Sequence, residues 1–449
     1  MERKVLLPTP ENLIDSFLKN SIGRNESIYE FIDILNDIKG NYSLALDSDW
    51  GNGKTFFVKQ TQMIIDALNP NRYKSSEYSD SDYKKILEQN PQDKLKIQTI
   101  SHITTYYDAW ENDNDVDPIL SIVYAIISSL GLDEEKIAQT PNMLTLISSI
   151  VTLVTGKDIV GFKENIEGKD LLEKIRETKE IKKNVNDLIN GLFAEHGDRI
   201  IIFIDELDRC RPDFAIELLE RIKHYFTNDK ITFVFSVNLN QLQHTVKKIY
   251  GNEFDGYRYL DRFFDLKISL PDTDEHKFLN CVNFKAENRV TDRVVKASIY
   301  MCNLSLREQI KFMQKVQLVQ ERCERNEMIG SAISHSFIVY ILIPIMIALK
   351  FSDINEYEEF KKGENYNILV ELLMNPMLQE DLMYGVSSNL FNSNEISLTN
   401  NCKTIDNILV EEKAIQVYNA IFKNQNDQIG SIFINNRIRD KVKELQSII

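Results

Sequence analysis

The stretch that decides the fold is Ser48-Asp49-Trp50-Gly51-Asn52-Gly53-Lys54-Thr55. Gly51 and Gly53 lack a Cβ and tolerate positive φ, so the backbone there can approach phosphate oxygens closely. Successive N–H groups and the N-terminus of a following helix can then hold the anion. Lys54 can reach the terminal phosphates, and the Thr55 hydroxyl can ligate magnesium. The stretch therefore predicts a loop that binds a nucleoside triphosphate with Mg²⁺.

The flanks of this loop fit the same interpretation. A short strand is predicted over Tyr42–Leu46, directly before the loop, and a helical pattern begins at Phe56. The general pattern has glycine where this chain has Ser48, which predicts a slightly distorted loop that still binds, because its Gly-Lys-Thr core is intact. A chance match in a surface loop is the alternative, and the flanking elements count against it. We expect the following loop residues to contact the nucleotide: Ser48, Trp50, Gly51, Asn52, Gly53, Lys54 and Thr55.

A second half of the site is predicted where a continuous apolar run ends in acid. Arg199–Ile204 is typical of a central strand buried on both faces, and Asp205 and Glu206 follow it directly. A carboxylate at the tip of such a strand lies beside the phosphate loop in this class of sheet. We expect Asp205 to hold Mg²⁺ and Glu206 to act as the general base toward water. A solvated acidic loop is the competing interpretation, and the pairing with the phosphate loop weakens it.

Further residues are candidates to complete the site. Asn238 follows the apolar run Ile231–Val237, where it either positions the attacking water or simply caps the strand end. Arg262 precedes the last predicted strand and is a candidate arginine finger, while Arg307 is a candidate nucleotide contact from a later helix. Ordinary helix-surface arginines are the alternative for both. We count Lys54, Glu206, Asn238 and Arg262 as the candidate catalytic set.

The order of elements predicts an α/β fold with a C-terminal helical domain. Residues 1–272 alternate strands and helices, with further strands expected over Leu95–Tyr107 and Leu266–Leu270, which favours a parallel sheet sandwiched by helices. Residues 69–94 are polar and are expected to form a solvent-exposed excursion. A helical insertion is expected over about 112–198. From 273 to 449 the periodicity is helical, and an all-α domain is predicted.

Composition limits the classes of function. The formal net charge is −15, which repels nucleic-acid backbones, and no basic block predicts a nucleic-acid patch. The five scattered cysteines and the absence of a signal peptide favour a reducing, cytoplasmic location. The six histidines lack metal-ligand spacing. The apolar runs 143–154 and 337–349 are shorter than the about 20 residues of a spanning helix, so buried helices are favoured over membrane association.

Taken together, these motifs resemble the KAP family of P-loop NTPases. The likeness rests on the tryptophan before Gly51, on Tyr107-Asp108-Ala109-Trp110, on Ile204-Asp205-Glu206-Leu207-Asp208-Arg209-Cys210, and on Tyr259-Leu260-Asp261-Arg262-Phe263-Phe264. It covers about residues 20–272, and Leu306–Met313 more weakly. The resemblance implies an additional-strand P-loop fold related to the AAA+ and STAND ATPases, and ATP rather than GTP. In many relatives the insertion carries membrane-spanning helices, and bacterial members are often linked to anti-phage defence. Ser48 for glycine and Asp108 for asparagine depart from the family pattern.

Two functions from different classes follow from the sequence. The first is a Mg²⁺-dependent, ATP-hydrolysing molecular switch, in which the helical domain contacts a protein partner or another copy of the chain. The second is a regulatory or scaffold module that binds nucleotide without turnover, a reading that Ser48 motivates. A membrane-anchored scaffold that uses runs 143–154 and 337–349 is a weaker third reading.

Overall fold

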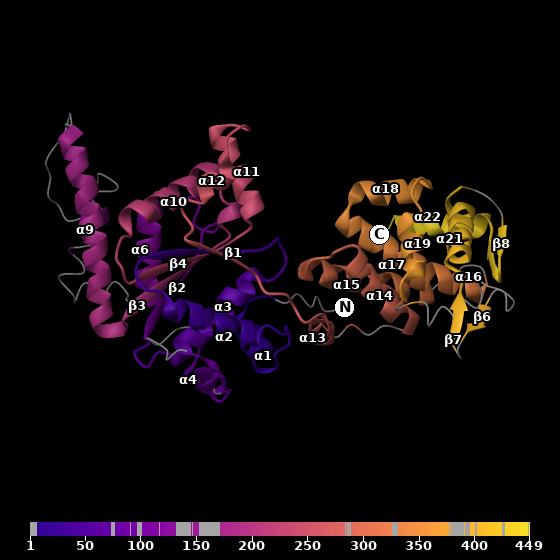
Figure 1. Ribbon diagram of the computed structural model, residues 1–449, viewed down its shortest axis with the longest axis horizontal. Coiled ribbons are helices and arrows are strands. Elements are labelled where there is room, and N and C mark those ends of the chain that lie inside the picture. The colour runs from indigo at the N-terminus through magenta and orange to yellow at the C-terminus, as the bar shows by residue number, and fades with distance from the viewer. Residues whose placement is uncertain are drawn as a thin grey trace. The chain divides into compact units, whose positions relative to one another are not determined.

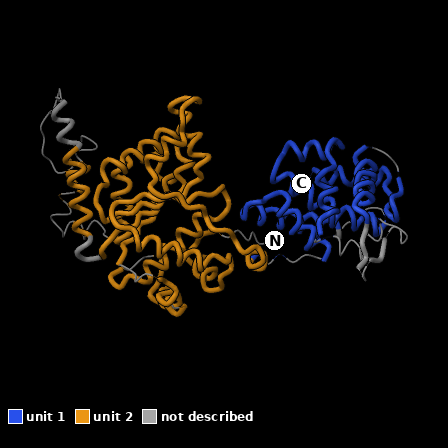
Figure 2. Tube along the Cα trace, in the orientation of Figure 1, with its two compact units in different colours: residues 1–5, 282–449 blue, residues 6–281 orange. Residues whose placement is uncertain are grey.

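The chain folds into two compact units, Leu6–Cys281 and Val282–Ile449 (Figure 2). The computed structural model describes residues 7–72, 77–89, 91–96, 101–115, 117–131, 145, 147–151, 171–282, 284, 289–325, 331–376, 378, 390, 396–399, 402–423, 427–447 and 449. The division falls after residue 281, whereas the sequence predicts a boundary after 272, so helix α13 (Glu275–Cys281) lies with the first unit.

The first unit is built on a five-stranded parallel sheet of order β2-β3-β4-β1-β5. Its strands are β1 Tyr42–Asp47, β2 His102–Asp108, β3 Arg199–Asp205, β4 Ile231–Val237 and β5 Leu266–Ser269. β4 lies between the strand that precedes the phosphate loop and the strand that ends in acid. In register, Asp47 pairs with Val237 and Asp205 pairs with Ser236, so the carboxyl ends of β1, β4 and β3 are level. This is the additional-strand arrangement that the resemblance implies.

Helices cover both faces of this sheet (Figure 1). The alternation of β3 explains why, because Ile200, Ile202 and Ile204 pack into one apolar cluster while Ile201 and Phe203 pack into the other. The first cluster includes side chains of α6 Pro118–Ser129, α9 Leu171–His196, α10 Pro212–Tyr225 and α11 Leu239–Tyr250. The second includes side chains of α1 Pro10–Leu18, α2 Asn25–Asp37 and α3 Lys54–Leu68. The predicted sandwich of a parallel sheet by helices is confirmed.

The polar segment 69–94 is more structured than the sequence predicts. It holds helices α4, Asp80–Leu87, and α5, Pro91–Lys94. The side chains of Tyr83 and Ile86 are buried in the second cluster, and Ser79 closes the N-terminus of α4 with a capping box. The expectation of a solvent-exposed excursion is therefore wrong for α4, because two apolar residues in a polar segment suffice to bury one helix face. Of the apolar run 143–154, only 145 and 147–151 lie among the described residues, and Ile150 is buried.

The second unit is mainly helical. Its helices are α14 Arg289–Met301, α15 Leu306–Arg325, α16 Ala332–Phe337, α17 Ile343–Ser352, α18 Ile354–Lys362, α19 Asn367–Met374, α21 Asn407–Phe422 and α22 Asn436–Gln446. Two short antiparallel pairs, β6 Ile396–Thr399 with β7 Cys402–Ile405 and β8 Asp427–Ile429 with β9 Ile432–Ile434, add to the predicted helices. These strands have three or four residues each, too short for a periodicity signal.

One helix in the described part of the chain is long and apolar enough to cross a membrane. It runs from Ala332 to Ser352 through a π-helical turn at Ile338–Leu342, and its mean hydropathy is 2.2. Of the most apolar 18-residue segment of this helix, 78% is buried inside the unit, as in the core helix of a soluble protein. Length and hydropathy alone are therefore weak evidence for a membrane span.

Candidate functional site

The phosphate loop joins the end of β1 to the start of α3. Gly51 has φ 91° and Gly53 has φ 86°, which are left-handed conformations that strain any residue with a Cβ. Gly53 is the N-cap of α3, so the N-terminal amides of that helix face the loop. Ser48 stays in the sheet network through a 3.2 Å bond from its N–H to the carbonyl of Val237. Its hydroxyl accepts a bond from the Asn52 amide at 3.2 Å.

The Lys54 side chain folds across its own loop. Its ammonium donates to the carbonyl oxygen of Ser48 at 2.5 Å and to that of Asp49 at 3.2 Å. The residue is only 9% exposed. Burial lowers the pKa of Lys54, and the nearby carboxylates, Asp208 first, oppose that effect. A mostly buried cation held by loop carbonyls can exchange them for phosphate oxygens, which are stronger acceptors.

Thr55 and Asp205 join the two halves of the site. The Thr55 hydroxyl donates to Oδ2 of Asp205 at 2.6 Å, across 150 residues of sequence. Tyr106 of β2 donates its hydroxyl to the same oxygen at 2.9 Å, and the Glu206 N–H donates to Oδ1 at 3.0 Å. Asp205 is 1% exposed. A hydroxyl and a carboxylate are the hard oxygen ligands that Mg²⁺ takes when it binds with substrate phosphates, so this donor set fits the ion.

Glu206 has an unusual backbone and a tight partner. Its φ is 60°, a left-handed conformation that is rare for a residue with a long side chain. Oε2 of Glu206 lies 2.5 Å from Nε of Arg209. Burial raises the pKa of Glu206 to about 7, with Asp205 adding to the rise and Arg209 opposing it. A carboxyl group with a pKa near neutrality suits proton transfer at physiological pH.

Two tryptophans lie beside this turn. Trp50 donates its indole N–H to Oδ2 of Asp208, while Oδ1 of Asp208 has no hydrogen-bond partner among the described residues. The Arg209 guanidinium lies 6.0 Å from the ring centre of Trp50 and 5.5 Å from that of Trp110, within the range of cation–π attraction to Trp110 and at its limit for Trp50. Burial raises the pKa of Asp208. The phosphate loop and the acidic turn are thus linked a second time, through aromatic side chains.

Asn238 has two roles at the end of β4. Its Oδ1 accepts the Gln241 N–H at 3.1 Å, which caps α11, and its Nδ2 donates to Oδ1 of Asp49 at 3.0 Å. Asn238 therefore acts as a cap, at the start of α11, while its action on the attacking water stays a prediction. Asn238 is 3% exposed, so its amide is fixed between the strand tip and the loop.

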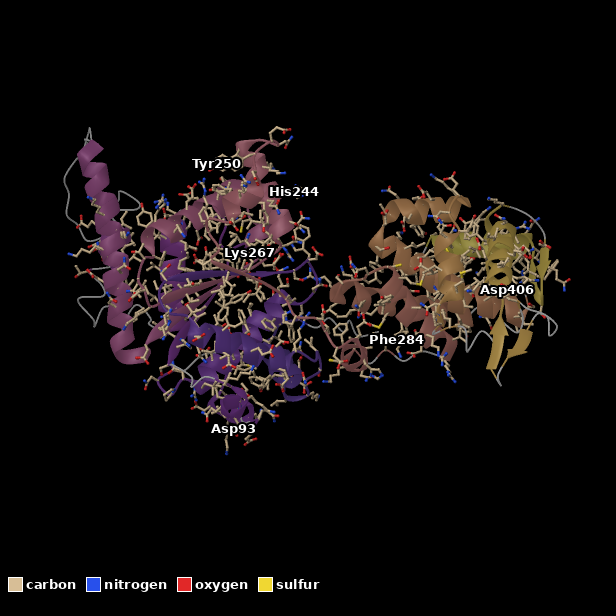
Figure 3. All side chains as sticks on the ribbon, in the orientation of Figure 1. Asp93, His244, Tyr250, Lys267, Phe284 and Asp406 are labelled. Atoms are coloured by element: carbon tan, nitrogen blue, oxygen red, sulfur yellow. The ribbon has the colours of Figure 1, made fainter. Side chains whose placement is uncertain are left out.

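The two candidate arginines, Arg262 and Arg307, are both exposed. Arg262 is exposed on the turn between α12 (Gly256–Leu260) and β5. Its neighbour Asp261 pairs with Lys267 at 2.8 Å. Lys267, which is labelled in Figure 3, belongs to β5. An exposed arginine at this edge is available to a neighbouring chain, as an arginine finger requires. Arg307 is exposed near the start of α15, in the second unit, and its contact with the nucleotide stays a prediction.

Sequence reasoning missed several residues that contact the site. Arg24, 6% exposed, donates to the carbonyl of Asn52 in the loop at 2.8 Å, and burial lowers its pKa to about 10. Tyr106, Asp208 and Arg209 were also not proposed as site residues. Only Asp208 and Arg209 carried a signal, since they follow the acidic pair directly in sequence. Among the described residues, no group of three or more His, Cys, Asp or Glu side chains could hold a metal ion by itself.

A parallel sheet of this strand order, with a glycine loop after β1 and an acidic tip after β3, defines a nucleotide-binding domain of the P-loop class. The chain belongs to the KAP family, because the sequence model of the KAP family P-loop domain matches residues 24–355. That match reaches beyond the first unit into α18.

Among curated proteins, the chain is similar to an uncharacterized protein of Methanocaldococcus jannaschii. The two are 35% identical over 74 residues, which is 16% of this chain and 38% of that protein. The chain covers well under half of that relative, and the likeness carries no activity.

Proposed function

We propose that this chain binds ATP with Mg²⁺ and hydrolyses it, and that it acts as a molecular switch. The observation that carries the proposal is the 2.6 Å contact between Thr55 and Asp205, which brings the two halves of the site together. Glu206 stands next to that contact in sequence, with a pKa raised to about 7. A carboxyl group directly after the metal-binding aspartate supports hydrolysis, because it can accept the proton of an attacking water.

Each residue then has a chemical role. The loop amides and Lys54 bind the phosphates and offset their charge, while Thr55 and Asp205 hold the metal ion. Bound Mg²⁺ withdraws charge from the phosphate oxygens. Glu206 accepts the proton of the attacking water, and Asn238 keeps the loop and the strand tip in register. Arg262 is the candidate to act on a neighbouring copy of the chain.

Phosphate release from Mg²⁺–ATP tests the proposal. Purified chain is compared with Lys54→Ala, Glu206→Gln and a control, Lys19→Ala, which removes an exposed lysine paired with Asp15. We expect turnover in the unmodified chain and the control, and loss in both site variants. Omission of Mg²⁺ and replacement of ATP by GTP extend the test to the metal and the base. Turnover that survives Lys54→Ala would overturn the proposal.

The alternative is a regulatory module that holds nucleotide without turnover. The bonds from Lys54 to the Ser48 and Asp49 carbonyls motivate it, because the loop satisfies its own cation. In that case the unmodified chain and Glu206→Gln retain the same triphosphate after long incubation. Under hydrolysis, only Glu206→Gln retains triphosphate while the unmodified chain releases diphosphate. Sedimentation with lipid vesicles tests whether such a module associates with membranes.

We assign the output of the switch to the second unit, as the surface for a protein partner or for self-association. The family resemblance favours a role in anti-phage defence. Phage plaque counts in cells that express the chain or its Lys54→Ala variant test the role. Light scattering with and without ATP tests self-association.

A further inference from the structure

Contacts with surrounding residues, and not the intrinsic preference of its backbone, hold Glu206 in a left-handed conformation. A left-handed φ of 60° is unfavourable for glutamate, and such conformations persist where surrounding contacts over-determine them. The backbone supplies some of these contacts. The Arg209 N–H donates to the Glu206 carbonyl at 3.0 Å, and the Cys210 thiol lies 3.6 Å from the same oxygen. These bonds fix the turn but leave the Glu206 carboxylate free to rotate.

The Arg209 side chain fixes the carboxylate. Its Nε is 2.5 Å from Oε2 of Glu206, and the two side chains are only 24% and 18% exposed. The matching pair in the same unit, Arg258 and Asp255, has the same sequence spacing but lies at 3.4 Å with 88% and 58% exposure. Water screens the exposed pair and not the covered one, so a strong restraint is expected only at Glu206.

Arg209 is itself restrained by the nucleotide loop. Its guanidinium lies near the rings of Trp50 and Trp110, which are the two tryptophans of the chain. Trp50 belongs to the phosphate loop and is bonded to Asp208. The chain of contacts therefore runs from the loop through Trp50 to Arg209 and then to the Glu206 carboxylate.

We propose that Arg209 is a positioning residue, which orients the carboxylate of Glu206 toward the reacting water through its ion pair and its packing against Trp50 and Trp110. The inference rests on the proposed hydrolysis, which it deepens. Arg209 does not transfer a proton. It acts through Glu206, and its loss should lower turnover without lowering nucleotide affinity, because the loop, Lys54 and Thr55 keep their contacts.

Kinetics of Arg209→Gln, Arg209→Lys and the control Arg258→Gln test this inference. We expect Arg209→Gln to lower kcat by about tenfold to a hundredfold, the range that small misplacement of a catalytic group produces. The dissociation constant of a non-hydrolysable ATP analogue should change by less than about threefold, which is within the free energy that a single solvent-accessible ion pair typically contributes. Arg209→Lys should recover part of kcat, because it keeps the charge without the planar fork. Arg258→Gln should change neither quantity.

A double variant separates action through Glu206 from independent action. Adding Arg209→Gln to Glu206→Gln should lower kcat no further, because residues that act as a unit are non-additive. A further loss in the double variant, a weaker analogue affinity, or faster turnover by Arg209→Gln would each overturn the inference.

A chain that shows no turnover above Lys54→Ala would refute the proposed hydrolysis, and thermal unfolding then decides the pairing. Non-additive shifts in the midpoint among Arg209→Gln, Glu206→Gln and the double variant support the restraint of Glu206 by Arg209. Additive shifts overturn it.

Discussion

The indole of Trp50 donates a hydrogen bond to the carboxylate of Asp208, across 158 residues of sequence. Trp50 is 44% exposed to solvent, so it is not a core residue and its role is not simply to fill the interior. Asp208, in contrast, is 7% exposed and has its second oxygen without a partner among the described residues. The indole N–H is therefore an important part of what makes burial of this carboxylate tolerable.

Replacement of Trp50 by phenylalanine should destabilise the first unit. The ring is kept, but the Asp208 carboxylate loses its side-chain donor, which costs about 1–3 kcal/mol for a buried polar group. Thermal unfolding should show a midpoint lower by about 2–10 °C. The control is Trp110→Phe, which changes the other, 53% exposed indole beside Arg209. Equal midpoints for the two variants would contradict the assigned role of the Trp50–Asp208 bond.

Removal of the Tyr106 hydroxyl should weaken the metal site selectively. Burial, with the nearby Asp205 charge, raises the pKa of Tyr106, so its phenol stays protonated and donates to Asp205. Partners that orient a metal ligand typically contribute about 10–100-fold to metal affinity. For Tyr106→Phe, we expect the Mg²⁺ concentration for half-maximal binding of a fluorescent ATP analogue to rise about tenfold. The neighbouring Tyr107→Phe loses a bond to Ser121 instead and should leave that concentration unchanged.

Gly53→Ala should weaken the phosphate loop through its backbone. A Cβ at φ 86° costs roughly 1–2 kcal/mol per residue, and relief of that strain would displace the first turn of α3. We expect a lower midpoint of unfolding together with a loss of nucleotide affinity in titration calorimetry. Gly191→Ala is the matched control, because this residue lies inside α9 with nothing within 4 Å of an added Cβ. It should stabilise by about 0.5–1 kcal/mol.

Asp66 should make the stability of the first unit fall as pH rises. Burial raises its pKa from 3.8 to about 7, although Thr104 donates a bond of 2.5 Å to it. Because the folded pKa lies above the unfolded one, the folded state binds more protons between these values, and its stability is lost progressively from about pH 4 to about pH 7. Asp66→Asn should remove that dependence.

The check is the midpoint of thermal unfolding at a series of pH values from 5 to 8. The difference between Asp66→Asn and the unmodified chain should grow toward high pH. Asp15→Asn, at an exposed carboxylate, serves as the control. A constant difference across the series would assign the effect of Asp66→Asn to a change in packing instead of protonation.

Local sequence patterns predict the strands that carry the site. β4 matches the predicted Ile231–Val237, and β1 and β3 each extend the prediction by one residue, because continuous apolar runs between loops specify buried strands. The glycine loop and the acidic tip are also local in sequence. The strand order is not, and it followed here from the family resemblance.

The contacts that tune the site escaped prediction for a physical reason. Tyr106 of β2 and Asp205 of β3 are 99 residues apart in sequence. Nothing in the composition of β2 indicates that one of its tyrosines donates a hydrogen bond to β3, which is two strands away from the strand before the loop. Arg24 looks like an ordinary residue between two helices until the fold brings it to Asn52. Such partners are set by the tertiary arrangement and not by periodicity.

The position of β4 has a mechanical consequence. It separates β1 from β3, so the sheet hydrogen bonds of the loop strand and of the acidic strand both go to β4 and not to each other. The described bonds that join the two halves directly come from side chains, at Thr55 with Asp205 and at Trp50 with Asp208. A ligand that inserts between the two halves of the site can therefore replace these side-chain contacts one by one, while the backbone hydrogen bonds of the sheet stay intact. The sheet therefore serves as the rigid frame, and the side-chain contacts across the end of β4 are the part that a ligand can rearrange.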